Sequence, residues 1–157
     1  MRNEEIILKL IEDNITISTA ESCTGGSLGK IITAVPGASS IYGYGFITYA
    51  NEAKEKILGV SHDTLEKHGA VSPDTALKMA KGARDVSGSD IAVSVTGIAG
   101  PGGGTPEKPV GLVYIAISDK NGEEYRKLNL SGNRDEVRAK SCDEVFKLIK
   151  ERLNFLK

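Results

Sequence analysis

Short apolar segments that suit strands alternate with helical segments over the first two thirds of the chain, and this alternation constrains the fold more than any other feature. Residues 15–19, 43–50 and 91–95 predict strands, because each is short and rich in β-branched or aromatic side chains. Around them, apolar residues recur at helical spacing. They predict helices over residues 4–13, 51–58, 61–68 and 73–86, with another that begins at 28 and stops near 35.

The last third of the sequence has a different pattern. Residues 110–118 and 123–130 flank Lys120-Asn121-Gly122, a sequence that favours a type I′ hairpin turn. A long amphipathic helix is predicted over residues 134–153. Together the two patterns predict an α/β fold, a three-layer α/β/α sandwich with a mixed, mostly parallel sheet and one antiparallel hairpin.

Composition narrows the function class. The length of 157 residues predicts one domain (1–157). The net charge of −1 predicts no basic surface of the kind that binds nucleic acid or a membrane. No apolar run approaches the ~20 residues that span a bilayer, and the acidic N-terminus is unlike a signal peptide. Cys23 and Cys142 have no metal-ligand or disulfide spacing. We therefore expect a cytoplasmic protein with no metal and no cofactor.

Small polar residues and glycines gather where the predicted strands end, at residues 21–26, 50–54 and 96–104. Ligands of open α/β sheets bind beyond the carboxyl ends of the strands, so we expect the site there. Two of these segments predict anion-binding nests of backbone amides, residues 24–26 at a helix start and residues 97–104 in a glycine loop. Glycines that only make tight turns are the alternative.

Residues 38–54 carry the parts of a nucleophile with a non-histidine base. Ser39 and Ser40 supply hydroxyls, Tyr49 a phenol and Lys54 an amine. If Asn51 caps the following helix, the helix dipole and burial would both lower the pKa of Lys54 from its usual ~10.4 toward the range of a base. The alternative is that these residues have no catalytic role and form a buried strand between two surface loops, followed by a solvated lysine.

Four other patterns match known motifs by accident. Residues 25–29 have the spacing of a G-x-S-x-G nucleophile elbow, but both histidines precede the later strands that would carry its acid. Residues 27–30 have S-x-x-K spacing without a K-T-G partner. Residues 24–31 fail the Walker A pattern twice, and residues 100–105 lack the last glycine of G-x-G-x-x-G.

Several motifs in order carry a resemblance over almost the whole chain. The chain resembles the nicotinamide-nucleotide amidase family, the CinA C-terminal domain, in residues 19–26, 48–54, 68–72, 96–101, 108–111 and 131–134. This resemblance implies metal-free hydrolysis of the carboxamide of nicotinamide mononucleotide to nicotinate mononucleotide and ammonia. It also implies a small-molecule nucleotide as the partner.

The resemblance also implies residue roles. The serine nucleophile of the family falls on Ser39, its tyrosine on Tyr49 and its lysine base on Lys54. Ser40 follows Ser39 directly, so the nucleophile could be either of two adjacent hydroxyls. Asn133 replaces an acidic residue that is common in the family before the arginine at position 134. The implied ligand-binding residues are Ser22, Thr24, Gly25, Gly26, Thr96, Gly97 and Arg134.

Two other functions remain open from the sequence. One is a nucleotide-binding or regulatory module that uses the same pocket without turnover, and the other is an amidase for a different small carboxamide. A homo-oligomer is also open, because the apolar positions of residues 43–50 or of the final helix suit a dimer contact or a core equally.

Overall fold

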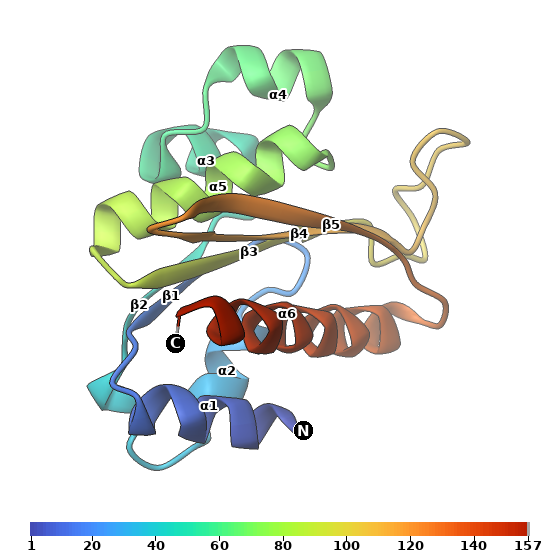
Figure 1. Cartoon of the computed structure of the whole chain (residues 1–157). Coiled ribbons are helices and arrows are strands. Elements are labelled where there is room, and N and C mark those ends of the chain that lie inside the picture. Colours follow the sequence, from blue (N-terminus) through green and yellow to red (C-terminus); the bar gives the residue numbers. More distant parts are fainter. Residues whose placement is uncertain (157) are drawn as a thin grey trace.

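A five-stranded sheet with helices on both faces forms the body of the molecule (Figure 1). The computed structural model describes the backbone of residues 1–156 and the side chains of residues 1–154. Helices α3, α4 and α5 lie on one side of the sheet, with α4 packed on α5, and α1, α2 and α6 lie on the other, so the predicted three-layer α/β/α fold is confirmed. The elements are α1 (Asn3–Glu12), β1 (Ile17–Glu21), α2 (Ser27–Thr33), the 3₁₀ turn η1 (Ala38–Ser40), β2 (Tyr42–Ile47), α3 (Asn51–Leu58), α4 (His62–His68), α5 (Pro73–Ser87), β3 (Ile91–Gly97), β4 (Leu112–Asp119), β5 (Gly122–Asn129) and α6 (Arg134–Leu156).

The strand order is β2-β1-β3-β4-β5. β1 pairs in parallel with both β2 and β3, whereas β3–β4 and β4–β5 are antiparallel. The carboxyl ends of β1, β2 and β3 therefore meet at the same end of the sheet. An irregularity in the register at Gly43 affects only the beginning of β2, and pairing with β1 is regular from Tyr44 to Ile47.

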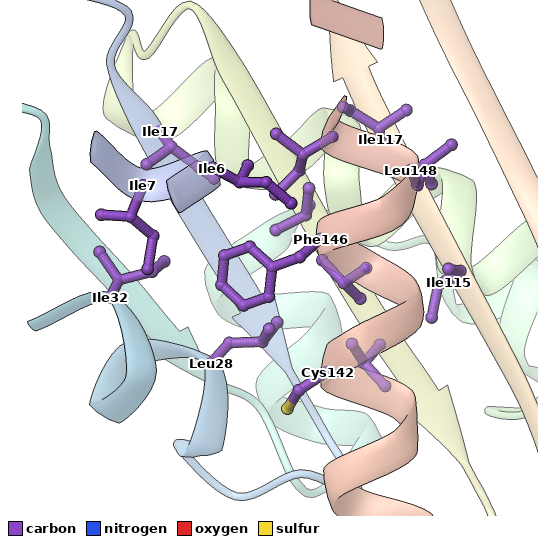
Figure 2. Packing of buried hydrophobic residues seen from close by; sticks show 14 of the residues in the cluster. Ile6, Ile7, Ile17, Leu28, Ile32, Ile115, Ile117, Cys142, Phe146 and Leu148 are labelled. Carbon is purple, nitrogen blue, oxygen red and sulfur yellow. The ribbon is translucent and has the colours of Figure 1, made fainter. Parts of the chain in front are cut away.

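The larger core lies between the sheet and the layer of α1, α2 and α6. Figure 2 shows Phe146 of α6 at its centre, near Leu28 of α2 and Ile6 of α1. On the opposite face, α5 packs against the sheet with small residues such as Ala80 and Ala83. A Cβ on Gly82 would stand 1.9 Å from the carbonyl oxygen of Leu58, so α5 and the end of α3 can meet only through a glycine. This contact fixes α3 beside the sheet.

Two boundaries differ from the sequence prediction in ways that matter for the site. β1 runs over residues 17–21 rather than 15–19, which makes Glu21 the last strand residue, and its side chain is buried. β2 ends at Ile47, and α3 begins at Asn51 with Ala50 as its N-cap residue. The prediction that Asn51 caps this helix is wrong, since Asn51 is its first helical residue and the N-cap position is held by Ala50, which has no capping side chain.

Candidate active site

A cavity of about 260 Å³ opens at the carboxyl ends of β1, β2 and β3. Its walls come from the β1–α2 turn, the β2–α3 connection, the α4–α5 loop, the glycine loop after β3 and the first residue of α6. Six of the predicted site residues line it: Ser22, Tyr49, Lys54, Thr96, Gly97 and Arg134. Four do not: Thr24, Gly25, Gly26 and Ser39.

Lys54 is fully buried at the base of this cavity, in the first turn of α3. Its Nζ donates hydrogen bonds to the carbonyl oxygens of Thr48 (2.7 Å) and Tyr49 (3.2 Å) and to Oγ of Ser22 (3.1 Å). Burial lowers the pKa of Lys54 to about 8, since no carboxylate is among its partners. The predicted direction of the shift is confirmed, and desolvation is its main cause.

Ser22 follows β1 directly and is nearly buried, with its backbone amide bonded to the carbonyl oxygen of Val95 on β3 (3.0 Å). The strand pairing therefore fixes the serine opposite the amine of Lys54. Cys23 also lines the cavity, but burial raises the pKa of its thiol to about 11, so it stays protonated at neutral pH. Ser22 is thus the hydroxyl that the fold brings to Lys54.

The carboxylate of Glu21 fills the N-terminus of α2. One oxygen accepts from the hydroxyl of Thr24 (2.7 Å) and from the amides of Gly26 (3.2 Å) and Leu28 (2.9 Å), and the other accepts from the amide of Gly29 (3.1 Å). The prediction of an anion nest for a ligand at residues 24–26 is therefore wrong, because the chain supplies the anion itself. Sequence reasoning missed Glu21, although an acid followed by a glycine-rich helix start was the available signal.

Thr24 and Gly25 also serve the turn rather than the cavity. The guanidinium of Arg138 donates to the carbonyl oxygen of Thr24 (3.1 Å), and a Cβ on Gly25 would meet that guanidinium. Together with the Glu21 bonds, these contacts hold the segment that begins with Ser22. Residues 24–26 therefore stabilise the turn that carries Ser22, although they do not line the cavity.

The open side of the cavity is formed by Arg134 and the glycine loop after β3. Arg134 donates to the carbonyl oxygen of Gly100 (2.8 Å) and to the hydroxyl of Tyr49 (3.2 Å). It is the first residue of α6, where Asn133 and Glu136 exchange side chain–backbone hydrogen bonds of 2.9 and 3.0 Å in a capping box. The phenol of Tyr49 therefore lies toward Arg134, while only the backbone carbonyl of Tyr49 reaches Lys54.

Thr96 and Gly97 shape the inner wall. The hydroxyl of Thr96 donates to the carbonyl oxygen of Ala70 (2.7 Å) and so ties the α4–α5 loop to the end of β3. A Cβ on Gly97 would come within 2.8 Å of the carbonyl oxygen of Leu112, so the loop can leave β3 here only with glycine. Within the described residues, the amides of Ala99 and Gly100 donate to no group of the chain, and both residues line the cavity.

Ser39 lies at the other end of the sheet. It belongs to η1, which precedes β2, whereas Lys54 follows β2. Six strand residues span about 20 Å. Ser39 and Ser40 are exposed and line a different cavity, so the prediction that Ser39 reaches Lys54 is wrong within one chain. The length of β2 therefore separates the hydroxyls of Ser39 and Ser40 from the amine of Lys54.

Comparison with known proteins now identifies the family. The sequence model of the CinA C-terminal domain matches residues 2–153. The chain belongs to the CinA C-terminal domain family. A putative competence-damage inducible protein of Caldanaerobacter subterraneus subsp. tengcongensis is 53% identical over 151 residues, which are 96% of this chain and 37% of that protein. This CinA domain thus spans little more than a third of the length of such relatives.

Solved structures of CinA proteins share the fold. The competence/damage inducible protein CihA from Agrobacterium tumefaciens is 42% identical, with a TM-score of 0.91 over 95% of this chain and 94% of that one. The competence damage-inducible protein A from Klebsiella pneumoniae is 32% identical, with a TM-score of 0.94 over the whole of both chains. The resemblance inferred from the sequence motifs is confirmed at the level of the family.

The described part of this CinA domain has neither a metal-binding cluster nor a membrane-spanning helix. Among the described residues there is no group of three histidine, cysteine or carboxylate side chains placed to hold a metal ion. None of the helices that the structure describes has the length and apolar character that crossing a membrane requires.

Proposed function

We propose that this CinA domain is an amidohydrolase in which Ser22 is the nucleophile and Lys54 the general base. The observation that carries this proposal is the 3.1 Å contact between Oγ of Ser22 and Nζ of Lys54 inside the cavity. A serine attacks a carbonyl well only when a base within hydrogen-bonding reach takes its proton. The role that the family resemblance implied for Ser39 is therefore transferred to Ser22.

The partners of Lys54 favour the base role. A neutral amine has two hydrogens and one lone pair. The carbonyl oxygens of Thr48 and Tyr49 accept the two hydrogens, which leaves the lone pair for the hydroxyl of Ser22. Because burial lowers the pKa of Lys54 to about 8, a useful fraction of the amine is neutral near pH 7 to 8.

The reaction then proceeds in two halves. Lys54 takes the hydroxyl proton as Oγ of Ser22 bonds to the carboxamide carbon, and the carbonyl oxygen becomes an oxyanion. Collapse of this intermediate breaks the C–N bond, and the lysine proton leaves with the nitrogen as ammonia. Neutral Lys54 next takes a proton from water, the resulting hydroxide cleaves the ester, and Lys54 returns that proton to Oγ of Ser22. The carboxylic acid product gives its own proton to the released ammonia and departs as the carboxylate, with ammonium.

The amide of Cys23 is the proposed donor to the oxyanion. It follows the nucleophile directly, its residue lines the cavity, and within the described residues its only acceptor is the thiol of its own side chain. An aligned donor of this kind contributes roughly 3–4 kcal/mol to the transition state. The Glu21 bonds to the following turn hold this amide in place.

Nicotinamide mononucleotide is the proposed substrate, on the strength of the family resemblance and of the charge around the cavity. Its carboxamide goes to Ser22 at the base, and its phosphate goes to Arg134 and the free amides of the glycine loop at the mouth. Arginine and backbone amides are the donors that bind phosphate in proteins. The ring of Tyr49, which is 62% exposed, is available to stack on the pyridine.

Ammonia release from nicotinamide mononucleotide tests this function directly, with free nicotinamide as the comparison substrate. We expect release from the nucleotide, much less from nicotinamide, and none from Lys54→Met, which keeps the length of the side chain without its base. Lys54→Met should still bind the nucleotide in a calorimeter.

Two results would contradict the proposal in different ways. Nucleotide binding by the wild-type protein without ammonia release would favour a regulatory module. Faster release from free nicotinamide or another small carboxamide would reject the nucleotide as substrate while leaving the Ser22–Lys54 chemistry in place.

A further inference from the structure

The outer edge of β2 is bare. β2 pairs only with β1 and ends the sheet on that side, so its other edge has no strand partner in the described chain. Gly43 and Gly45 are exposed, and because glycine has no side chain, this means that the backbone itself is accessible. Large apolar side chains flank the edge: Tyr44 is 51% exposed and Ile47 is 57% exposed.

The two edges of the sheet differ in charge. Between Lys30 and Glu52 the sequence has no charged residue, so the whole of η1 and β2 is uncharged. At the opposite edge, β5 carries Glu123, Glu124, Arg126 and Lys127, and Arg126 pairs with Glu124 and with Glu151 of α6. Charged side chains are a common device that prevents strand edges from pairing. β5 has this protection and β2 lacks it.

We propose that a second copy of this chain pairs with β2, antiparallel and across a two-fold axis that is normal to the sheet and passes near Tyr44. Such a pairing places each strand against its own sequence, and an uncharged segment meets itself without repulsion between like charges. It also joins the two sheets into one, so that the exposed rings of Tyr44 from both copies lie together on the α5 side. Tyr44 already stacks on Phe46 there, with 6.3 Å between ring centroids.

The same pairing has a consequence for the site, and this part rests on the proposed function. With Tyr44 near the axis, residue 39 of one copy is opposite residue 49 of the other. Neighbouring strands are ~4.8 Å apart, so η1 of the second copy, with Ser39, approaches Tyr49 at the mouth of the cavity. Ser39 then contributes to the wall of the partner's site instead of acting as a nucleophile in its own.

Sedimentation of matched charge variants tests the interface. The wild-type protein is expected to sediment as a dimer, and Tyr44→Glu is expected to sediment at half that mass. Tyr125→Glu is the control, because Tyr125 is a tyrosine of similar exposure (45%) on the charged edge β5, and it should remain dimeric. Thermal unfolding of each variant verifies that it is folded before its mass is compared.

Crosslinking gives an independent readout of the geometry. Tyr44→Cys should form covalent dimers with a short bis-maleimide and Tyr125→Cys should not, while the native Cys23 and Cys142 are buried and stay unreactive. A monomeric wild type, including one whose edge binds an extended peptide instead, would overturn the proposal. So would a Tyr44→Glu variant as dimeric as Tyr125→Glu. These masses do not depend on ammonia release, so the interface and the proposed function fail separately.

The contribution to the site has its own measurement. Monomeric Tyr44→Glu should show a several-fold higher KM for the substrate with little change in kcat, and Tyr125→Glu should keep both constants. An unchanged KM in a monomeric Tyr44→Glu would overturn the contribution of Ser39 across the interface.

Discussion

Two cavities of nearly equal volume lie at opposite ends of the parallel strands, about 260 Å³ at the carboxyl ends and about 270 Å³ at the amino ends. Both contain serine hydroxyls. The first holds Ser22 beside a buried amine, whereas the second holds Ser39 and Ser40 among other hydroxyls and, within the described residues, is lined by no lysine or arginine. A cavity of this size with serine hydroxyls in its wall is therefore not sufficient to activate a nucleophile. The adjacent base is what activates it.

The largest expected effect separates the two serines. Ser22→Ala should lower kcat for ammonia release by roughly 10³-fold or more, because it removes the atom that forms the acyl-enzyme. Ser39→Ala, the matched change at the other end, should leave kcat within about twofold, because Ser39 forms no bond with the substrate in either the acyl-enzyme or its hydrolysis. Ammonia release at saturating substrate measures both. The reverse order of the two variants would restore Ser39 as the nucleophile.

The next effect is the dependence on pH, which only the cavity with the amine should show. Lys54 is protonated below its pKa of about 8 and cannot accept the proton of Ser22. kcat/KM should therefore rise with pH through a limb near 8 and be about 100-fold lower at pH 6 than on the plateau. Initial rates between pH 5.5 and 9.5 measure the limb. A rate that is flat across this range would contradict the role of Lys54 as base.

A smaller effect is expected at the mouth of the carboxyl-end cavity. Arg134→Gln should raise KM for nicotinamide mononucleotide by about 10-fold, since one charge-assisted hydrogen bond to the phosphate is lost. The same substitution should not change the rate with a substrate that lacks a phosphate. Arg126→Gln, on the distant β5 edge, is the control. Equal KM values for Arg134→Gln and Arg126→Gln would place the phosphate elsewhere.

The smallest effect on turnover is expected behind the nucleophile. Glu21→Gln replaces a carboxylate that accepts four hydrogen bonds with an amide that must turn a donor toward some of them. The free energy of unfolding should fall by about 1–3 kcal/mol, and kcat should fall several-fold with KM little changed. Glu4→Gln, at the exposed start of α1, is the control for both measurements. A loss of stability with full kcat would show that Glu21 does not position Ser22.

Much of the fold was predictable because local patterns determine it. The hairpin after β4, the proline-started helix α5 and the short strands β1 and β3 all follow from periodicity and turn chemistry. The predicted type I′ turn is wrong, because Gly122, and neither Lys120 nor Asn121, has the positive φ. The end of the sheet that carries the site was predictable for the same reason, since the loops after parallel strands lie together. Six of the predicted site residues accordingly line one cavity.

The partner of Lys54 was not predictable from spacing. Ser39 is fifteen positions away in sequence but is separated from Lys54 by the length of β2, whereas Ser22 is farther in sequence and adjacent in space, because β1 and β2 pair in parallel. Glu21 was missed for a related reason. An acid between a strand and a glycine-rich turn looks solvated in sequence, and only the tertiary fold shows that the start of α2 encloses it.

The ion-paired edge strand β5 limits how far the molecule can assemble. A sheet with two bare edges could add copies without end and grow into a fibre, but here the charges of Glu124 and Arg126 oppose growth on that side. Under the proposed pairing through β2, association through strands therefore stops at two copies. The charged side chains of a single edge strand would thus limit the number of copies in the assembly.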